Sequence, residues 1–446
     1  MNRNLLLLLS VIAFLSSCSL APQYKRPEAP IPATWPSGAA YQETQAMPGV
    51  PTTTEIQWRE FFTDERLQKV VEMALNNNRD LRLAALNVQR ARAIYGIQRA
   101  ELFPAVNATA SGSRQRVPSD LSSNGQATTK ERYDVNLGII AWEIDFFGRI
   151  RSLKDRALEE FLATEQARRS THILLVSAVG DAYLALAADR EKLKLAETTF
   201  ETQKEAYHLI KRQYEVGLAS ELDLNRAQTQ VDVARRDIAF FTQLVAKDEN
   251  ALNLLVGTLS PVPSELLPAD LASVTPLKEI STGISSEVLL RRPDILQAEN
   301  LLKAANANIG AVRAARSGTW SFAPQVIMPI FDARLWSAVN ATEAEKEIAL
   351  VQYEKAIQTA FREVADALAV RGTVGEQLSA QQSIVSATAE TYRLSNARYN
   401  KGIDSYLSVL VAQRSLYAAQ KVLVTTRLAR LVNQVRLYAV LGGEAQ

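Results

Sequence analysis

The segment "QYEVGLASELDLNRAQ" (213–228) recurs at an offset of 185 as "RYNKGIDSYLSVLVAQ" (398–413). Both copies place a glycine, Gly217 or Gly402, at the point where one long helical pattern stops and the next begins. An internal repeat of this kind indicates that the chain is built from equivalent structural units. The repetition predicts two equivalent helical hairpins, each of which turns at its glycine.

Two long tracts around these glycines, 149–256 and 333–441, contain no proline. They are rich in Ala, Leu, Glu, Gln, Arg and Lys, which favour helix, and their apolar residues recur at alternating spacings of three and four, as in coiled coils. The first helix of each tract would approach ~68 residues, roughly 100 Å at ~1.5 Å per residue. Helices of this length do not fit within a compact globular domain, so we expect two long helical hairpins.

The duplication extends upstream with a different register. "RDLRLAALNVQRARAIYGIQRA" (79–100) matches "PDILQAENLLKAANANIGAVRA" (293–314) at an offset of 214 instead of 185, so a stretch is missing from the middle of the second copy. The predicted organisation is a signal peptide at 1–17, an extended leader at 18–60, a first repeat at 61–257, a connector at 258–283 and a second repeat at 284–441.

The middle of the first copy, 103–147, is predicted to form a β-hairpin. Its second strand alternates apolar residues (Tyr133, Val135, Leu137, Ile139) with polar or small ones, which is typical of a strand with one apolar face. The stretch 114–132 is polar and is expected to form a solvent loop, with a weaker strand before it. Strands of about ten residues are long enough to cross a bilayer in a tilted barrel. A soluble surface hairpin is the alternative.

Three aromatic residues, Trp142, Phe146 and Phe147, follow the predicted strand, where an aromatic girdle would lie at the membrane interface. A few strands cannot close a barrel, and open strand edges are not tolerated in lipid. Strands from several copies must therefore be pooled around a symmetry axis. In the second repeat only a truncated hairpin at 317–331 is recognisable, before the helical hairpin at 333–441.

The N-terminus resembles a lipoprotein signal. Leu5 to Leu15 form an apolar run behind Arg3, and this run has the length of a signal-peptide core. Cys18, the only cysteine of the chain, ends a "LSSC" motif that resembles the bacterial lipobox, so it is expected to become the lipidated first residue of the mature protein. An ordinary cleaved signal with a chance cysteine is the alternative.

Composition argues against several other classes of protein. Removal of the signal peptide would take away one charge, Arg3, and leave nearly equal numbers of basic and acidic residues, a balance unlike that of an electrostatic nucleic-acid binder. Glu143 and Asp145 could mimic a catalytic carboxylate pair but are expected to be interfacial charges. His172 and His208 are expected to lie on one helix about 54 Å apart, too far for a shared metal. We expect no enzymatic activity, no metal and no cofactor.

Several stretches resemble the TolC- and OprM-like outer membrane factors: "SLAPQYKRP", "FFTDERLQKVVEMALNNNRDLR", "WEIDFFGRIRS", "GISSEVLLRRPDI", "ANANIGA" and "AQRSLYAAQ". The resemblance covers essentially the whole mature chain. It implies a mainly α fold with a small β part: a homotrimer with a twelve-stranded outer-membrane barrel, four strands from each protomer, above a long periplasmic α-helical tunnel. It also implies a passive exit duct for drugs, dyes or metal ions, joined through a periplasmic adaptor to an inner-membrane resistance-nodulation-division pump.

The resemblance also assigns roles to residues near the two glycines. The adaptor would dock at the hairpin tips, which are Gly217, Leu218, Ala219, Gly402, Ile403 and Asp404. The closed periplasmic aperture would be formed by Leu407, Ser408 and Val411. Val411 stands where the family usually carries an aspartate, which argues against cation binding at the closed mouth.

Two other interpretations of the same features stay open. The first is a lipid-anchored coiled-coil adaptor without a pore, which would have one helical hairpin between the halves of a β-domain. The second is a channel variant that lacks a barrel strand because of the gap in the second repeat. Two hairpins from an internal duplication favour the duct over the adaptor.

Overall fold

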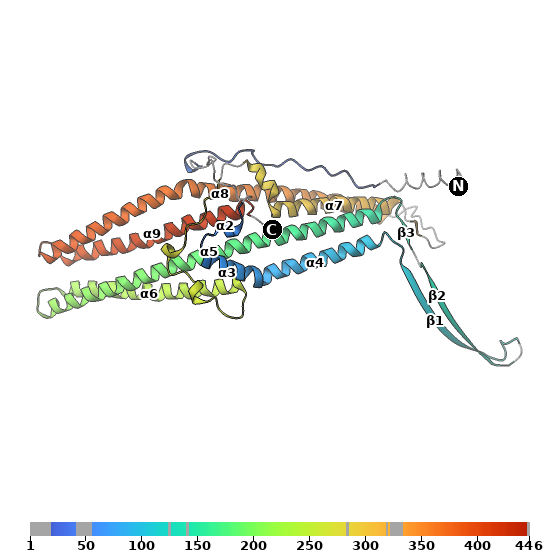
Figure 1. Ribbon diagram of the computed structural model, residues 1–446, viewed down its shortest axis with the longest axis horizontal. Coiled ribbons are helices and arrows are strands. Elements are labelled where there is room, and N and C mark those ends of the chain that lie inside the picture. Colours follow the sequence, from blue (N-terminus) through green and yellow to red (C-terminus); the bar gives the residue numbers. More distant parts are fainter. Residues whose placement is uncertain are drawn as a thin grey trace. The chain divides into compact units, whose positions relative to one another are not determined.

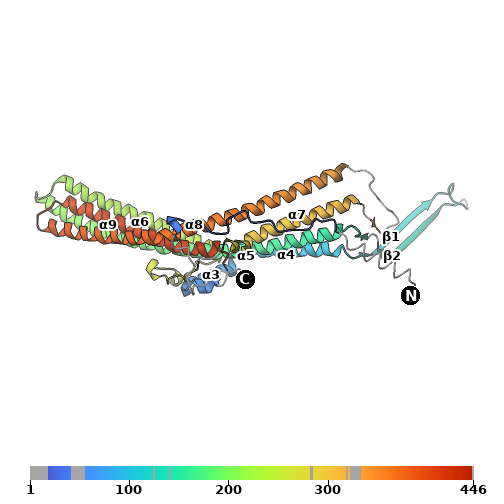
Figure 2. The ribbon, with the colours of Figure 1, turned by 90° about the horizontal axis from the view of Figure 1, so that it is seen from above.

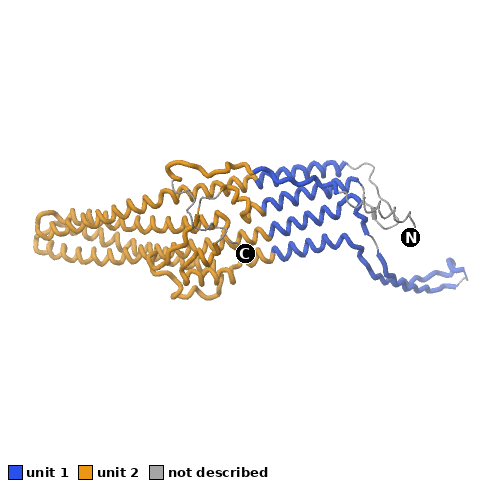
Figure 3. The backbone as a smooth tube through the Cα atoms, turned by 45° about the horizontal axis from the view of Figure 1, so that its top comes forward, with its two compact units in different colours: residues 1–28, 87–164, 297–353 blue, residues 29–86, 165–296, 354–446 orange. Residues whose placement is uncertain are grey.

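The computed structural model describes residues 19–41, 56–123, 126–139, 142–281, 285–317, 320–321 and 333–443. The signal peptide, Cys18 and most of the expected truncated hairpin at 317–331 lie outside these ranges. Contacts within the chain define two compact units, shown in two colours in Figure 3. Unit 1 takes residues 1–28, 87–164 and 297–353, and unit 2 takes residues 29–86, 165–296 and 354–446. Each unit therefore combines segments of both repeats.

Long helices occupy both proline-free tracts, as expected. The first tract forms α5 (Arg149–Glu215) and α6 (Glu221–Val256), and the second forms α8 (Ala333–Asn400) and α9 (Tyr406–Val440). Helices α5 and α8 contain 67 and 68 residues. Each contributes to both compact units, because a helix of this length, at ~1.5 Å per residue, is too long for one core.

Shorter elements precede each helical hairpin. In the first repeat they are α2 (Trp58–Phe61), α3 (Glu65–Asn77) and α4 (Arg79–Ala100), and in the second repeat α7 (Pro293–Ser317). Short 3₁₀ turns lie at Ala39–Tyr41, Ser264–Leu266, Leu271–Ser273 and Ser286–Arg291. The side chain of Asp64 caps α3 by accepting hydrogen bonds from the backbone N–H groups of Arg66 and Leu67.

The internal duplication is visible in a pair of equivalent joints in unit 2. The amide of Asn78, just before α4, donates to the carbonyl of Leu255 near the end of α6 (2.8 Å). The guanidinium of Arg292, just before α7, donates to the carbonyl of Val440 at the end of α9 (2.7 Å). The sequence numbers of Asn78 and Arg292 differ by 214, and those of the two carbonyls differ by 185. The two offsets found in the sequence thus relate the same contact in both repeats.

A glycine lies two positions after each of these carbonyls, where the helix ends. Gly257 and Gly442 both have positive φ angles, 70° and 100°, which side chains disfavour. A Cβ at position 257 would also lie 2.9 Å from the carbonyl oxygen of Asn77. Both joints therefore require glycine for the backbone conformation. In the first repeat glycine is also required because the backbone at 257 lies close to that of Asn77.

The core of unit 2 is built against an apolar stretch of α5. Gly180 brings α5 close to Phe62, because a Cβ there would lie 2.8 Å from the phenylalanine ring. Phe61 beside it stacks on Tyr438 of α9 at 4.6 Å. Helix α5 is long and apolar enough to cross a membrane by length and composition, but 56% of the stretch concerned is buried within the protein. We conclude that this stretch is core.

Further along unit 2 the two helical hairpins pack on each other, which can be followed in Figure 2. One apolar cluster joins Ile210 of α5, Ala227 of α6 and the first turn of α9, and Tyr392 of α8 packs against it. All four long helices contribute to this cluster. The hairpins therefore form one four-helix arrangement close to their turns.

The sheet part of unit 1 consists mainly of a two-stranded antiparallel ribbon, β1 (Val106–Val117) and β2 (Thr128–Ile139), drawn as long arrows in Figure 1. The solvent loop expected from 114 to 132 is shorter than that, since both strands contain 12 residues and β1 extends to Val117 and β2 begins at Thr128. The polar residues there remain in the ladder because they pair across it. Arg114 lies opposite Glu131, and their side chains form an ion pair of 3.1 Å.

Two further strands of unit 1 are very short. Strand β3 (Glu143–Ile144) pairs antiparallel with β4 (Trp320–Ser321), with Ile144 opposite Trp320 and Glu143 opposite Ser321. Among the described residues, only β1 and β2 are long enough to cross a bilayer.

The described leader residues, 19–41, lie along the helices of each unit. In unit 1, Asn306 of α7 donates to the carbonyl of Pro22, and Tyr24 donates to Glu299. In unit 2, Trp35 stacks on Phe361 of α8 at 5.1 Å. These contacts hold an extended, proline-rich segment in place with little secondary structure.

Candidate functional site

The register of the β1–β2 ribbon separates its residues into two chemically distinct faces. Residues directly opposite each other in an antiparallel pair lie on the same face. One face carries Tyr133, Val135, Leu137 and Ile139 together with their partners Gly112, Ala110, Ala108 and Val106. The other carries Asn107, Thr109, Ser111, Ser113, Asp134 and Asn136. The ribbon is therefore apolar on one face and polar on the other.

The apolar face is fully open in the protomer. Tyr133, Val135 and Leu137 are 78–82% exposed, far more than is usual for large apolar side chains. The face spans about 20 Å, at ~3.3 Å per residue from Val106 to Gly112, before the charged pair Arg114 and Glu131. This height is close to the ~25 Å apolar band of a transmembrane barrel. A two-stranded ribbon is also only marginally stable in water.

Tyr133 closes the apolar band at its far end. Its ring lies over Gly112, where an added Cβ would come within 3.2 Å of two ring carbons. The side chain is exposed, and the charged residues of the same face begin immediately beyond it with Arg114 and Glu131. Sequence reasoning counted this residue within the alternating pattern and missed its position at the limit of the apolar band, which only the strand register reveals.

The three predicted interface aromatics lie elsewhere. Trp142, Phe146 and Phe147 lie between β2 and α5, not on the ribbon. The two carboxylates among them are ion-paired: Glu143 with Arg149 (2.8 Å from Oε1 to Nε) and Asp145 with Arg151 (3.2 Å). These pairs fix the chain where it enters α5, which leaves no free carboxylate pair for acid–base chemistry at this place. The role of the three aromatics at a membrane interface stays a prediction.

The first hairpin tip is a tight turn between α5 and α6. Gly217 has a φ of 75°, and the N–H of Leu218 donates to the carbonyl of Gln213 (2.7 Å). This pattern is typical of helix C-termini. Ser220 then caps α6 in a capping box with Asp223, in which the hydroxyl accepts from the Asp223 N–H at 3.1 Å. Leu218 at the apex is 80% exposed, so the tip is a preformed turn with an apolar apex.

The second tip repeats this turn with different side chains. Gly402 has a φ of 71°, and the N–H of Ile403 donates to the carbonyl of Arg398 (3.0 Å). Asp404 pairs with Arg398 through two hydrogen bonds of 2.6 and 3.3 Å, which hold the pKa of its carboxyl below the ordinary range. Ser405 caps α9 without a side-chain hydrogen bond. Ile403 at the apex is 59% exposed.

Behind the tips a tyrosine joins the two hairpins. The hydroxyl of Tyr399 on α8 donates to Gln213 on α5 (2.9 Å), and its ring lies 5.4 Å from that of Tyr406 on α9.

Farther from the tips, Asp237 of α6 is buried but accepts hydrogen bonds from Tyr417 (3.0 Å) and Lys421 (2.9 Å) of α9. Burial alone would raise the pKa of Asp237, but these bonds and one from Arg236 hold it below its usual value.

The three predicted aperture residues lie together on the first turns of α9. Leu407 and Val411 are 41% and 45% exposed and form a ridge between two grooves. The larger groove, of about 540 Å³, lies between α8 and α9 and contains Leu407, Ser408 and Val411 among serines and threonines. The smaller groove, of about 190 Å³, lies between α6 and α9 and also contains Arg226 and Arg414.

Sequence reasoning missed Arg226 and Arg414. They belong to different repeats, and only the packing of α6 against α9 brings them to one groove. Both charged residues that line the two grooves are cationic. Among the described residues, neither groove is lined by a carboxylate.

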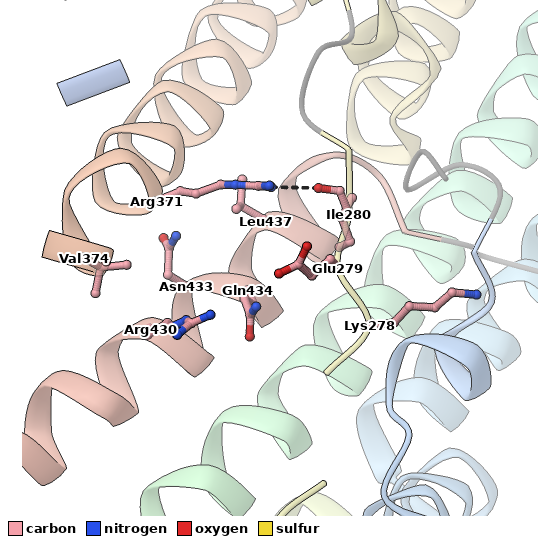
Figure 4. A pocket seen from close by; sticks show the side chains of 10 residues that line it. Lys278, Glu279, Ile280, Arg371, Val374, Arg430, Asn433, Gln434 and Leu437 are labelled. Atoms are coloured by element: carbon pink, nitrogen blue, oxygen red, sulfur yellow. Dashed lines mark hydrogen bonds between the residues drawn. The ribbon is translucent and has the colours of Figure 1, made fainter. Parts of the chain in front are cut away.

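A third cavity, of about 240 Å³, lies farther along unit 2 between α8, α9 and the connector (Figure 4). Arg371 of α8 donates to the carbonyl of Ile280 (2.7 Å), while Lys278 points away and pairs with Glu60 (3.1 Å). These bonds attach the connector to the second hairpin and to α2. The two residues thus hold the connector in place beside the cavity.

No group of three or more His, Cys, Asp or Glu residues that could hold a metal ion occurs in the described part of the chain. His172 and His208 both lie on α5, as expected. The rise of the helix separates them by about 54 Å.

Comparison with known proteins agrees with this architecture. Residues 70–258 and 314–443 match the family model described as outer membrane efflux protein. The toluene efflux pump outer membrane protein TtgC of Pseudomonas putida is 47% identical over 464 aligned positions, covering 98% of this chain and 95% of the relative. The probable outer membrane lipoprotein SilC of Salmonella typhimurium is 35% identical, covering 98% of each. The open-state MtrE outer membrane channel of Neisseria gonorrhoeae has 31% identity and a TM-score of 0.83, covering 96% of this chain and 98% of that one.

The fold and the ribbon thus define an outer membrane channel protein, and the chain belongs to the outer membrane efflux protein family. The resemblance to the TolC- and OprM-like factors and the location in the outer membrane are confirmed. So is the expected fold class: a mainly α chain, internally duplicated, whose fold combines a helical tunnel with a β-barrel shared between three protomers. The family is one of efflux channels, so the protein acts as the outer membrane channel of an efflux system.

Proposed function

We propose that this protein is the passive exit duct of a tripartite efflux system, lipid-anchored through Cys18 and extending from the outer membrane into the periplasm. The observation that carries the proposal is the β1–β2 ribbon, because its apolar face is exposed in the protomer and suits hydrocarbon. Helices α5 and α8 are of the length that a tunnel in the periplasm requires.

Assembly of three protomers is supported by apolar stripes that are exposed in the described part of the protomer. Helix α4 has no buried residue, and Leu83, Leu86, Ile94 and Ile97 are 45–63% exposed along it. Trp336, Ile348 and Val351 of α8 are also exposed. Contiguous apolar surface of this kind marks interfaces between subunits. Different stripes on one chain suit the heterologous contacts of a closed ring.

The partners follow from the hairpin tips. Leu218 and Ile403 present exposed apolar apices on tight turns. We assign these tips to docking of a periplasmic adaptor, and the ridge of Leu407 and Val411 to the closed aperture. The adaptor in turn links the duct to an inner-membrane pump of the resistance-nodulation-division class. As the names of the toluene and antibiotic efflux relatives suggest, the cargo is expected to be organic solvents and antibiotics rather than metal ions.

The test is cross-linking in cells that contain the cognate pump and adaptor. Leu218→Cys and Ile403→Cys, treated with a short thiol-to-amine cross-linker, should yield an adduct with the adaptor. Ile384→Cys serves as the control, because Ile384 is 48% exposed on α8 but lies several turns from the tip. Equal adducts from all three variants, or none from the tip variants, would remove the docking assignment.

A lipid-anchored adaptor, the alternative function, is not favoured. An adaptor would contain one helical hairpin, whereas this chain has two that pack on each other. We expect no catalytic activity, since the carboxylate pair near β3 is held in ion pairs.

A further inference from the structure

The helix that carries the ridge of Leu407 and Val411 has an unbalanced charge. Helix α9 contains five basic residues and no acidic residue among its 35. Its counterpart in the first repeat, α6, contains six acidic and four basic residues among its 36. Because the two helices occupy equivalent places in the repeats, the excess of positive charge belongs to the second hairpin and does not follow from the shared fold.

Two of these cations are paired with carboxylates of the first hairpin. Lys421 pairs with Asp237 of α6 (2.9 Å), and Arg427 pairs with Glu191 of α5 (3.5 Å). Arg414 is different, because it is exposed and forms no ion pair within the part of the chain that the structure describes. Its charge is therefore not cancelled inside the protomer.

Arg414 lies on the same side of α9 as the ridge. Leu407, Val411 and Arg414 follow each other at spacings of four and three residues, which places them on one face of a helix. All three are exposed, and all three line the groove of about 190 Å³ between α6 and α9. A charge at Arg414 therefore acts directly beside the apolar ridge.

The second guanidinium of this groove belongs to Arg226 of α6. It lies 3.8 Å from the carboxyl of Asp223, which also accepts a 2.6 Å hydrogen bond from the hydroxyl of Ser220 in the cap of α6. The charge of Arg226 is thus partly offset. We therefore expect Arg414 to contribute more than Arg226 to the field in the groove.

The protein on the other side of Arg414 is polar but uncharged. Arg414 also lines a cavity of about 210 Å³ between α5, α6 and α9, whose other described walls are threonine, glutamine, tyrosine and small apolar side chains. Gln203 in this wall is buried, and its side-chain oxygen has no hydrogen-bond partner among the described residues. The surroundings of Arg414 thus supply hydrogen-bonding groups and no negative charge.

We infer that the closed periplasmic aperture is selective for anions and that Arg414 is the residue that determines this selectivity. The inference rests on the proposed function, which assigns the ridge of Leu407 and Val411 to the aperture. Each of three protomers brings one Arg414 and one Arg226 to this opening. Rings of Arg or Lys favour anions in a pore, as rings of Asp or Glu favour cations. Low-dielectric walls such as the apolar ridge strengthen the field of such a ring.

Reversal potentials in planar bilayers under a KCl gradient test the selectivity. We expect the unmodified protein to admit chloride about threefold more readily than potassium. Arg414→Gln should remove this preference, whereas Arg414→Lys should keep it because lysine retains the charge. Arg226→Gln should reduce the preference by a smaller amount, since Asp223 already offsets part of that charge.

Arg430→Gln is the matched control for the loss of one positive charge. Arg430 is an exposed cation of the same helix, but it lies about 24 Å farther along α9 at ~1.5 Å per residue. This distance exceeds the Debye length of about 10 Å at 0.1 M salt, so the selectivity of Arg430→Gln should equal that of the unmodified protein.

Several results would overturn the inference. One is a preference for potassium in the unmodified protein, and another is equal selectivity in Arg414→Gln and Arg430→Gln. A third is loss of the oligomer on unheated gels in Arg414→Gln but not in Arg414→Lys, because Arg414 would then serve to hold the protomers together. If the unmodified protein forms no channel at all, the proposed function itself is contradicted, and the inference with it.

Block of the current by a multivalent anion tests binding at the ring. The probe is hexacyanoferrate(III), added on the side to which the protein is added, where the helical part remains. It should block the unmodified protein at concentrations about tenfold lower than those needed for Arg414→Gln, because its attraction scales with the charge of both partners. Hexaammineruthenium(III), a cation of equal charge number, should not block.

A carboxylate placed beside Arg414 provides a second variant. Val411→Asp lies three residues before Arg414 on the same helix, where the two side chains can pair. It should weaken the block by hexacyanoferrate(III) while the arginine itself stays in place. Block of the unmodified protein by the ruthenium cation and not by the anion would overturn the inference but leave the proposed function, which the adaptor cross-links test independently.

Discussion

The two repeats of this protein share equivalent contacts in unit 2 and differ in the described part of unit 1. In unit 2, the Asn78–Leu255 and Arg292–Val440 contacts occupy equivalent positions, and both tips turn on a glycine with φ near 70°. In unit 1, the first repeat carries a ribbon of two 12-residue strands, and the second repeat carries two residues of strand within its described part. The contacts that define the helical scaffold are thus repeated independently of the strands.

The largest effect is expected from a charge on the apolar face of the ribbon. Val135→Arg places a guanidinium near the middle of the apolar band, where it costs ~2–4 kcal/mol for each protomer. Assembled, heat-modifiable oligomer in outer-membrane fractions should fall at least tenfold on unheated gels. Asn136→Arg, on the neighbouring residue but the polar face, should assemble normally. Equal losses in both variants would show that the ribbon does not separate lipid from water.

The second comparison concerns the equivalent joints. Arg292→Met removes a buried guanidinium that bonds Asp294 (2.7 Å), Glu363 (3.1 Å) and the Val440 carbonyl. The two carboxylates are partly exposed, so the expected loss of stability is about 2–3 kcal/mol, below the value for a fully buried pair. Asn78→Ala removes the side-chain oxygen that accepts from the N–H groups of Asp80 and Leu81 at the start of α4, and with it the bond to Leu255. The expected loss of stability is about 1–2 kcal/mol. Thermal unfolding by circular dichroism in detergent should rank them in this order, and the reverse order would show that the bonds of Arg292 stabilise the fold less than those of Asn78.

Local pattern in the sequence was enough to place the long helices, the tip glycines and the alternating strand. These features depend on neighbours within a few residues. The sequence analysis assigned the polar ends of the ribbon to a loop. Arg114 and Glu131 adopt strand conformation because they form an ion pair across the ladder, and not because of their local sequence preference. The groove of Arg226 and Arg414 and the Tyr399–Gln213 bond depend on packing between repeats. The sequence pattern within one segment cannot predict contacts with a distant segment.

A third comparison uses a pair of aspartates related by the repeat offset of 185. Asp181 is half-buried on α5, and burial raises the pKa of its carboxyl to about 6, against the effect of nearby Arg436. Asp366 at the equivalent position of α8 is exposed. The folded protein binds a proton at Asp181 more tightly than the unfolded chain does, so this residue lowers stability as pH rises from about 4 to 6.

Asp181→Asn should therefore raise the melting temperature at pH 7, by an amount equivalent to about 2 kcal/mol, and should leave it nearly unchanged at pH 4. Asp366→Asn should change neither value. Part of the decrease in stability between pH 4 and pH 6 will persist in both variants, because burial and the charge of Asp189 also raise the pKa of Asp248 to about 6. If the melting temperature of Asp181→Asn rises as much at pH 4 as at pH 7, Asp181 affects stability by some means other than titration.

The smallest expected effect compares the caps of the two tips. Ser220→Ala removes the capping box with Asp223 and should weaken the first turn of α6 by about 1 kcal/mol. Ser405→Ala should cost far less, because the Ser405 side chain makes no capping bond and the second tip is held instead by the Arg398–Asp404 pair.

Such a difference is local and would scarcely move the melting temperature of the whole protein. Hydrogen exchange measured by mass spectrometry reports local opening directly. Amides of the first turn of α6 should exchange about fivefold faster in Ser220→Ala, while those of α9 in Ser405→Ala stay as in the unmodified protein. Asp404→Asn provides the converse control, since it should loosen the second tip alone. If Ser405→Ala opened its tip as much as Ser220→Ala, the two turns would be stabilised alike, and the repeats would be equivalent at this end in mechanism as well as in shape.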